Sequence, residues 1–540
     1  MRQTSENYNP FPDIRSPDVM MTFQVLSTSI TKQQIVPYSG EYGIAGTVYD
    51  TINGQSMLAH KYATTERYGW PLDGSCYVMP NSGVETGYWT NDVTDENGSF
   101  SSPVMLGYTL PKPIHTLGWT FHFDEPTRIY SPYVLAICLD ENNELVDEYE
   151  GLLEDDALPE NGWRLTHSVS GYTTVYFYFY GLNEPYRLFR LVEVDFGLSR
   201  TFTKDDFAEV DFQYELALDG SALPAKKLSF VFDNSDKEFN VLNPIDVYQY
   251  WRNGQSVSGN IRIGDDVINM GTFFISRAEI GQNYLTAKVT AYDQVKQLGE
   301  QKFYPGTLNQ QDYVTLQTAV EKVLDGYDIG VEYNGLGSEK VCLKISDNHT
   351  KRAVLHYLAQ AVRASVWIDR DNTVQFKRLE VKSTPDAELT ADALYNWSGV
   401  SVAEEVRGVT LTVQHDLDED TPTVTYTSGT PDAEGDTAAS YSNPCVYEDN
   451  GQDVADWLLV MANMAKKYAV KNRCDPAVEI GDTYKIADVF ENDDSAIISG
   501  IDIHYDGVLS SLVEASGEFA ADSTAPLVGI GAADQMTLTL

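Results

Sequence analysis

The sequence predicts a mainly β, multidomain protein of the α+β class, and three observations lead to this prediction. The chain has 540 residues, which is enough for three or four domains of about 150 residues each. Hydrophobic residues make up 42% and aromatic residues 12%, with 34 tyrosines, a composition typical of folded, strand-rich proteins. Short alternating or apolar runs, separated by Gly, Asn, Asp and Pro, recur about every ten residues.

The first strand-rich block runs from Asp18 to about Ser199. It contains the runs GWTFHF and TVYFYFY, and many short strands at this spacing suggest a β-sandwich. A second strand-rich block follows between residues 208 and 293, where AEVDFQYELAL, MGTFFISRAEI and YLTAKVTAYD are the clearest strands.

The middle of the chain predicts a small α/β unit. Apolar residues recur at helical spacing in two stretches, and Thr350 stands where it would cap the second helix. The segment SVWIDRDNTVQFKRL predicts a hairpin that turns at residues 369–372. The helical positions are Leu316, Ala319, Val320, Val323 and Leu324, then Val354, Tyr357, Leu358, Ala361 and Val362.

A third strand-rich block begins near Val400, is interrupted by a polar acidic loop, and continues to about Phe519. One helix is predicted within it, and we expect Trp457 at the centre of its apolar stripe, packed on the strands of this third block. The final residues are rich in Gly and Ala and are expected to be loose. The stripe consists of Val454, Trp457, Leu458, Met461, Met464, Ala465 and Tyr468.

The net charge of -43 argues against duplex DNA binding, because such an excess of carboxylate repels polyphosphate. The N-terminus lacks the pattern of a signal peptide, and the longest apolar run, TTVYFYFYGL, is too short for a helical span. We therefore expect no membrane anchor. The cysteines form no CxxC and predict neither a disulfide framework nor a zinc site; they are Cys76, Cys138, Cys342, Cys445 and Cys474.

The stretch KKLSFVFDNSDKEFNVLNP raises the question of a metal. Its residues Asp233, Asn234, Ser235 and Asp236 could offer several oxygen ligands to calcium, but the spacing does not fit an EF-hand loop. The alternative is a structural turn that ends a strand, because Asx and Ser side chains bond to nearby backbone. We favour the turn and expect no metal and no cofactor.

Catalytic motifs are absent from the sequence: it has no HExxH, no Gly-x-Ser-x-Gly elbow and no phosphate-binding loop. His115 and His122 lie around one predicted strand and could form a metal pair, but ordinary surface histidines are the favoured interpretation. With 80 acidic residues, carboxylate pairs at glycosidase spacing arise by chance. The sequence therefore predicts no catalytic residue and no enzyme.

Aromatic residues beside small polar ones mark a possible carbohydrate contact. The segments RYGW, GYWT and NGWR could present rings on which sugars stack, whereas burial in a sandwich core is the favoured alternative. The candidate contact residues are Trp70, Tyr88, Trp89 and Trp163.

Three central segments resemble tail hub proteins of phages and phage-derived particles that act on Gram-positive bacteria. They are LPAKKLSFVFDNSDKEFNVLNP, IRIGDDVINMGTFFISRAEI and YLTAKVTAYDQVKQLGEQKFYPG. The family pattern has Thr-Ala-x-Asp where this chain reads Thr-Ala-Tyr-Asp. Downstream, TKRAVLHYLAQAVRASVWIDRDNTVQFKRL and RCDPAVEIGDTYKI are similar to later hub domains, and upstream, ERYGWPLDGS and ETGYWTNDVTDENGSF resemble an inserted galactose-binding-like β-sandwich.

The resemblance implies two tail-tube-type β-barrels, a small α/β domain and an inserted sandwich. The implied division is an N-terminal arm and strand (1–37), the sandwich (38–200), the first barrel (201–305), the α/β domain (306–395), the second barrel with one helix (396–525) and a loose tail (526–540). In such a barrel the Asp233 turn closes one edge, and Asn243 and Pro244 lead to the next strand.

The function implied is that of a structural virion protein made in the host bacterial cytoplasm: a tail-tip or baseplate hub that closes the tail tube and organises host attachment. A homotrimer is implied, because two barrels in each of three copies match a six-fold tube. Implied partners are the tail tube, distal tail proteins, a fibre, spike or tape-measure protein, and host cell-wall carbohydrate, with DNA as passing cargo. The alternative is a carbohydrate-binding receptor-recognition protein or a glycoside hydrolase of the tail.

Overall fold

The computed structural model describes residues 1–517 with internal gaps. The residues outside the description are 3, 5–7, 12–16, 27–34, 38–42, 54–57, 59–60, 68, 72, 80–85, 125, 153–161, 236, 238, 240–253, 265, 282–283, 328, 398, 416–422, 431–436, 488–493 and 518–540. The predicted turn at Asn243 and Pro244 and the loose tail at 526–540 therefore lie outside the described residues.

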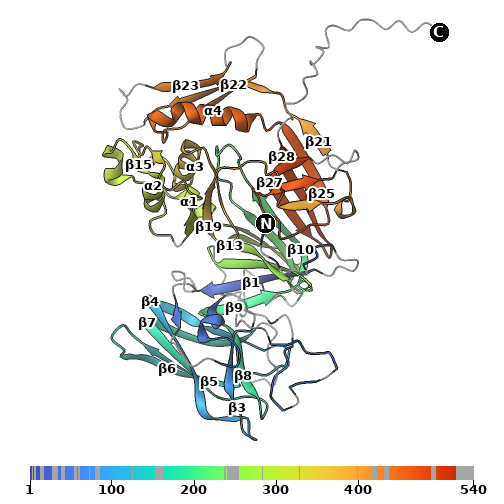
Figure 1. The fold of residues 1–540 in the computed structure, drawn as a ribbon. Helices are drawn as coiled ribbons and strands as arrows, with labels where there is room; N and C mark the ends of the chain where they lie inside the picture. The colour runs from blue at the N-terminus through green and yellow to red at the C-terminus, as the bar shows by residue number, and fades with distance from the viewer. Residues whose placement is uncertain are drawn as a thin grey trace, which may run out of the picture.

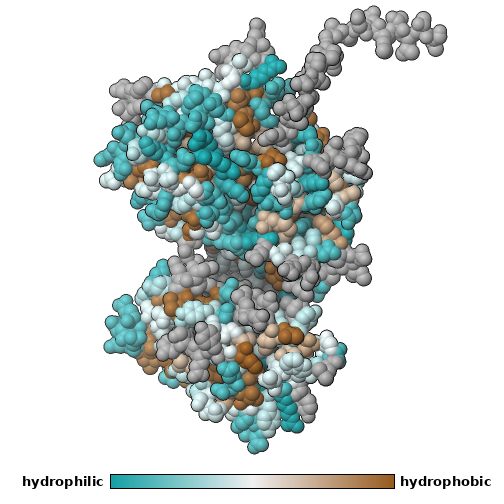
Figure 2. Space-filling model, in the orientation of Figure 1, coloured by the Kyte–Doolittle hydropathy of each residue, from teal (hydrophilic) through white to brown (hydrophobic). Residues whose placement is uncertain are grey.

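Strands dominate the described chain, which confirms the prediction of a mainly β, multidomain protein. Figure 1 shows strands β3 to β8 gathered in a lower lobe, β1 and β9 where this lobe meets the rest of the molecule, and a larger upper lobe that holds the later elements of the chain. Hydrophilic residues cover most of the visible surface, and apolar patches are scattered over both lobes (Figure 2). Among the described residues, no helix has the length and apolar character needed to cross a membrane.

Thirteen of the described strands form one sheet, the main sheet, along the path β21-β25-β28-β27-β10-β11-β14-β13-β12-β1-β9, with β26 beside β27 and β20 beside β26. Its strands from the first part of the chain are β1 (Asp18–Leu26), β9 (Gly197–Phe202), β10 (Phe207–Glu215), β11 (Lys227–Asp233), β12 (Ser256–Ile263), β13 (Asp266–Ile280) and β14 (Thr286–Tyr292). Those from the later part are β20 (Ala387–Leu389), β21 (Gly399–Val402), β25 (Lys466–Asn472), β26 (Thr483–Ile486), β27 (Ser495–Tyr505) and β28 (Leu509–Gly517).

The two strand sets predicted as separate barrels are hydrogen-bonded to each other through β10 and β27. They also share one core, because alternate residues of both strands point to the same buried side. Phe212 of β10 and Ile503 of β27 are opposite one another in the register and are both almost fully buried. The two halves therefore form one continuous body.

The lower lobe is an insert between two neighbouring strands of the main sheet. β1 and β9 pair antiparallel, and their paired ends Leu26 and Gly197 are the points where the chain leaves and returns. The sheet of the insert includes β2, so this sheet begins slightly before residue 38, and β9 returns to the main sheet before residue 200. Its elements are β2 (Val36–Pro37), η2 (Val48–Ile52), β3 (Tyr88–Val93), β4 (Ser99–Phe123), β5 (Tyr133–Leu139), β6 (Leu145–Leu152), β7 (Trp163–Gly181) and β8 (Leu188–Asp195).

Bulges in the longest strand of the insert shape its sheet around a core of aromatic side chains. The pairing of β4 with β7 shifts register between Thr116 and Gly118, where Gly118 has φ 140°. A Cβ at Gly118 would lie 2.0 Å from the carbonyl oxygen of Leu165, so a larger residue would force the strands apart. The core includes Trp119, Phe121 and other aromatic residues in edge-to-face contact.

The small α/β unit forms as the periodicity predicts. Thr350 caps its main helix, because the Thr350 hydroxyl accepts a hydrogen bond from the amide of Ala353. The hairpin turns where expected, with Asn372 at φ 59°. The elements are α1 (Gln294–Glu300), η4 (Gly306–Gln310), β15 (Val314–Thr315), α2 (Leu316–Val323), β16 (Gly330–Glu332), β17 (Lys340–Val341), α3 (Lys351–Ala361), β18 (Ser365–Ile368) and β19 (Thr373–Lys377). The short helix η5 (Ala391–Ala393) belongs to the core of the main sheet.

The prediction for the last helix is wrong in the length of its apolar stripe. Helix α4 (Gly451–Ala462) ends before Met464 and Tyr468, which belong to the core of the main sheet. It ends there because the side chain of Asn463 accepts from the Val406 amide and donates to the Val406 carbonyl, which ties the chain to β22. The helix packs on β22 (Val406–Val413) and β23 (Val424–Gly429), beside β24 (Thr437–Ser442) and η6 (Glu448–Asn450).

Trp457 is therefore only half-buried and packs against the core that α4 shares with the α/β unit. The sequence pattern indicated an apolar stripe but not which sheet it would cover. Consequently, the segment predicted as one barrel at 396–525 contributes to two different cores.

Four of the hub-like segments meet in a buried polar junction at the end of the main sheet. The ammonium of Lys226 donates to the carbonyl of Asp369 at 2.7 Å and lies 4.0 Å from the carboxylate of Asp293. Burial lowers the pKa of Lys226 and raises the pKa of Asp293 to about 6. Arg370 stands over the ring of Tyr214 and donates to two carbonyls of the later half. The junction thus joins the α/β hairpin to both halves of the main sheet.

Candidate functional site

The candidate functional surface is the solvent face of the main sheet where its two halves meet, which we name the seam. The register of β10 and β27 places Asp211 opposite His504 and Gln213 opposite Asp502. These four residues point away from the core, because side chains alternate along a strand and their neighbours are buried. The seam therefore has an apolar side within the core and a polar side toward solvent.

Carboxylates crowd the polar side of the seam. The pKa of Asp502 is raised by desolvation first and then by the charges of Glu514, Glu215 and Asp211. Lys227 offsets these charges in part. A carboxyl group surrounded by other carboxylates indicates a negative local potential, and such a surface repels polyphosphate.

His504 is held within this acidic group. Its Nδ1 donates to Asp211 Oδ1 at 2.7 Å, and its Nε2 lies 3.7 Å from Asp506. The hydrogen bond to Asp211 is the main reason that the pKa of His504 is raised. In the part of the chain that the structure describes, Glu209, Asp211 and His504 are the group whose ligand atoms, within 4.8 Å of one another, could hold a metal ion. The hydrogen bond to Asp211 already accounts for the orientation of the imidazole.

The Asx-rich turn at the end of β11 uses its oxygens within the turn. Asp233 Oδ1 accepts from the amide and hydroxyl of Ser235 at 3.0 and 2.5 Å. The side chain of Asn234 donates to the carbonyls of Phe239 and Tyr284, and accepts from the Phe239 amide. Residue 236 lies outside the described residues. These bonds favour the structural turn over calcium binding.

Two of the four candidate sugar-stacking residues are fully enclosed. Trp89 is 0% exposed, donates to the carbonyl of Thr86 at 2.8 Å, and lies under the guanidinium of Arg190. Trp163 is 3% exposed and packs on Phe121. Their burial leaves no ring face on which a sugar could stack.

The other two candidates, Tyr88 and Trp70, differ in their exposure to solvent. Tyr88 belongs to the core of the insert, whereas Trp70 is 57% exposed. The structure therefore does not bring the four residues together on one surface. Of the four, Trp70 alone presents most of its side chain to solvent.

The two histidines considered as a metal pair have separate partners. His115 Nδ1 lies 2.6 Å from the hydroxyl of Ser170 on an exposed part of the insert. His122 is buried, with Nε2 at 2.8 Å from Asp195 Oδ2. The geometry does not bring His115 and His122 to one site. No disulfide joins any of the five cysteines, all of which lie among the described residues.

Sequence reasoning missed a buried ionic cluster in the insert. Arg190 donates to the carboxylates of both Glu66 and Asp124, and all three side chains are almost fully buried. Glu66 also accepts a hydrogen bond from the amide of Leu188, so the cluster connects the segment around Glu66 to β8. The segment LFRLVEVD of β8 gave no signal that Arg190 would be buried along with its apolar neighbours.

Sequence reasoning also missed a row of tyrosines on the outer side of the insert. In β7, Phe177 and Phe179 are buried, whereas Tyr176, Tyr178 and Tyr180 face the other way. The signal was present in the run TVYFYFY, where Tyr alternates with Val and Phe, but that run was interpreted only as apolar.

Comparisons with known proteins give fold matches alone. A scan against protein-family models finds no match, and a search of curated proteins finds none. Among solved structures, the chain is similar to a tail protein from Neisseria meningitidis MC58, with 13% identity, a TM-score of 0.42, and coverage of 58% of this chain and 92% of that chain. It is similar to the 43 kDa tail protein of prophage MuSo2 from Shewanella oneidensis, with 12% identity, a TM-score of 0.42, and coverage of 59% and 94%. A third match is prophage tail protein gp18 from Listeria monocytogenes EGD-e, with 10% identity, a TM-score of 0.36, and coverage of 59% and 91%.

Proposed function

We propose that this chain is a structural virion protein: the tail-tip or baseplate hub of a phage or phage-derived particle that acts on Gram-positive bacteria. The observation that carries the proposal is the seam, where two strand sets join edge to edge into one sheet with a single core. The two halves of the main sheet in one chain can therefore form two adjacent parts of the wall of a ring, with no gap between them. The hub-like segments of the sequence lie in β11, β13 and β14 of this same sheet.

The charge of the seam supports a role beside a nucleic-acid channel. A wall that presents Asp502, Glu514 and Asp211 to solvent repels the phosphates of a passing DNA. The net charge of the whole chain, -43, is negative like the charge of the seam. DNA is then cargo that slides past the protein.

The ring we propose contains three copies of the chain. Each copy contributes the two halves of its main sheet, so three copies match the six-fold symmetry of a tail tube. Partners in the particle are the tail tube, distal tail proteins, and a fibre, spike or tape-measure protein. The hub closes the tube, organises host attachment, and has no enzymatic activity of its own.

Immunolabelling of intact particles tests this assignment. An antibody against the chain should mark the tail tip in negative-stain images, and a label on the capsid or on no particle would contradict the hub. Incubation of the purified chain with cell-wall polysaccharide tests the glycoside hydrolase alternative. The hub should release no reducing ends, whereas turnover would establish the alternative.

A further inference from the structure

The insert carries an outer surface whose chemistry differs from that of the main sheet. We define the tyrosine face as Tyr133 of β5 with Tyr176, Tyr178 and Tyr180 of β7. The register pairs Leu135 with Tyr178, so Tyr133 and Tyr180 lie at the next outward position. Their ring centroids are 5.6 Å apart. The two rings form a cross-strand aromatic pair whose exposed parts stay available for contact.

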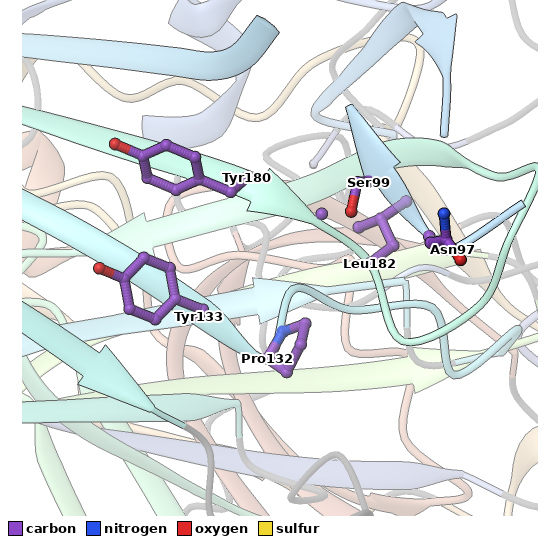
Figure 3. A pocket seen from close by; sticks show the side chains of 8 residues that line it. Asn97, Ser99, Pro132, Tyr133, Tyr180 and Leu182 are labelled. Atoms are coloured by element: carbon purple, nitrogen blue, oxygen red, sulfur yellow. The ribbon is translucent and has the colours of Figure 1, made fainter. Parts of the chain in front are cut away.

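A pocket adjoins this aromatic pair. It is an open surface hollow with a volume of about 400 Å³. Figure 3 shows the rings of Tyr133 and Tyr180 extending to the same side, with Pro132, Leu182, Asn97 and Ser99 farther along the pocket. The pocket therefore combines aromatic surface with an amide and a hydroxyl group.

The polar end of the pocket is fixed by its own hydrogen bonds. Asp95 Oδ1 accepts from the amides of Asn97 and Ser99 at 2.8 and 2.9 Å. The Gly98 carbonyl accepts from the Leu182 amide at 2.7 Å, which ties this turn to the end of β7. These bonds fix the backbone of the turn that carries Asn97 and Ser99 before any ligand arrives.

The charge around the tyrosine face selects the class of ligand. Glu150 and Glu148 lie on the neighbouring strand β6, and both contribute to the raised pKa of Tyr133 after desolvation. None of the described residues that line the pocket is a lysine or an arginine. An anionic ligand, such as a phosphate-bearing polymer, would meet repulsion and find no cationic partner.

We propose that the tyrosine face and its pocket bind a neutral carbohydrate. Tyrosine rings offer rigid, amphipathic surfaces against which the apolar side of a sugar ring can stack. Asn97 and Ser99 can donate to and accept from sugar hydroxyls, and Glu150 can accept. The site uses none of the four residues that the sequence had suggested. It is also independent of the proposed role of the main sheet in the tail.

The test uses the full chain and a panel of oligosaccharides that contain neutral hexose, 6-deoxyhexose and N-acetylhexosamine, with poly(glycerol phosphate) as the anionic comparator. Binding is measured on an array and then by titration calorimetry. At least one neutral oligosaccharide should bind, and Tyr180→Ala and Tyr133→Ala should each weaken it by about tenfold or more. The matched control is Tyr304→Ala, a tyrosine of the upper lobe that is 61% exposed and should leave affinity unchanged.

Four results would overturn the proposal. They are the absence of binding by every neutral sugar at millimolar concentration, unchanged affinity in both tyrosine variants, preference for poly(glycerol phosphate), and self-association of the chain that Tyr180→Ala abolishes. The last result would mean that a second copy occupies the face. Should either tyrosine variant unfold, Asn97→Ala at the exposed end of the pocket replaces it, with the same loss of affinity expected.

Discussion

The seam and the tyrosine face are both outer surfaces of β-sheets, yet they present opposite chemistry. In each sheet, alternate residues bury apolar side chains in a core, such as Phe212 in the main sheet and Phe177 in the insert. The intervening residues include Asp211 and Asp502 in the main sheet, and Tyr176 and Tyr178 in the insert. The buried apolar side chains explain why both sheets fold. The outward residues are not constrained by the core, and their chemistry indicates what each surface can bind or repel.

Deletion of the insert is the largest change we propose, because it removes the tyrosine face and leaves the seam in place. We expect a chain in which a short Gly-Ser linker joins Leu26 to Gly197 to remain folded, because these residues are already paired. Circular dichroism and a cooperative melt of the upper lobe check this. As a control, removal of residues 36–123 alone takes away the strand β4 that pairs with β7 and should cause aggregation. Aggregation of the Gly-Ser variant itself would show that the two lobes depend on each other.

Truncation of Trp457 should have a moderate effect on the upper lobe. The half-buried ring leads us to expect that Trp457→Ala lowers the free energy of unfolding by about 1–2 kcal/mol, below the ~3–5 kcal/mol typical of a fully buried tryptophan. Urea denaturation measures the loss. On the same helix, Val460→Ala is a control at a side chain that is 56% exposed and should change little. A loss as large as that of a core residue, or none at all, would contradict the packing of α4 described above.

Neutralisation of Asp502 should have a small effect on the melting temperature whose size depends on pH. Because its pKa is raised in the folded state, ionised Asp502 opposes folding above that pKa, and the penalty disappears as the pH falls through it. Asp502→Asn should therefore raise the melting temperature more at pH 8 than at pH 4.

Asp392 provides a control of opposite sign for the Asp502 experiment. Its hydrogen bond from Thr390 lowers its pKa, so the stability it contributes is present at neutral pH and lost on acidification. Asp392→Asn should lower the melting temperature at pH 8. Equal shifts for Asp502→Asn at both pH values would show that carboxylate repulsion at the seam is not what limits stability.

Chelation should have the smallest effect of all. The oxygens of Asp233 and Asn234 already take part in hydrogen bonds within the turn, and His504 at the seam is bonded to Asp211. We expect EDTA to leave the melting temperature unchanged. A large decrease that added calcium reverses would revive the calcium interpretation of the turn, and reversal by zinc would indicate the seam group.

The sequence predicted those features that depend on local periodicity. The α/β unit with its Thr350 cap, the hairpin at 369–372 and the strand-rich blocks follow from spacing and turn chemistry. The partner of α4 and the burial of Trp89 depend on contacts between distant segments, which the local pattern does not encode. The pairing of β10 with β27 is likewise non-local, so the seam could not be derived from either strand alone.

The proposed sugar site illustrates a second limit of sequence reasoning. Tryptophans next to glycine drew attention to RYGW and GYWT, but bulky rings in a sandwich are most easily buried, as Trp89 is. The informative signal was strict alternation, because a strand that buries Phe177 and Phe179 must present Tyr176, Tyr178 and Tyr180 outward.

Averaged cross-sections of the tail tip in intact particles test the central claim most directly, because they report both copy number and the side that the seam faces. The proposed function predicts three copies of this chain in one ring, with six half-sheets around a channel and Asp502 and Glu514 on the channel side. A ring of six copies, a single copy, or a seam directed away from the channel would contradict it.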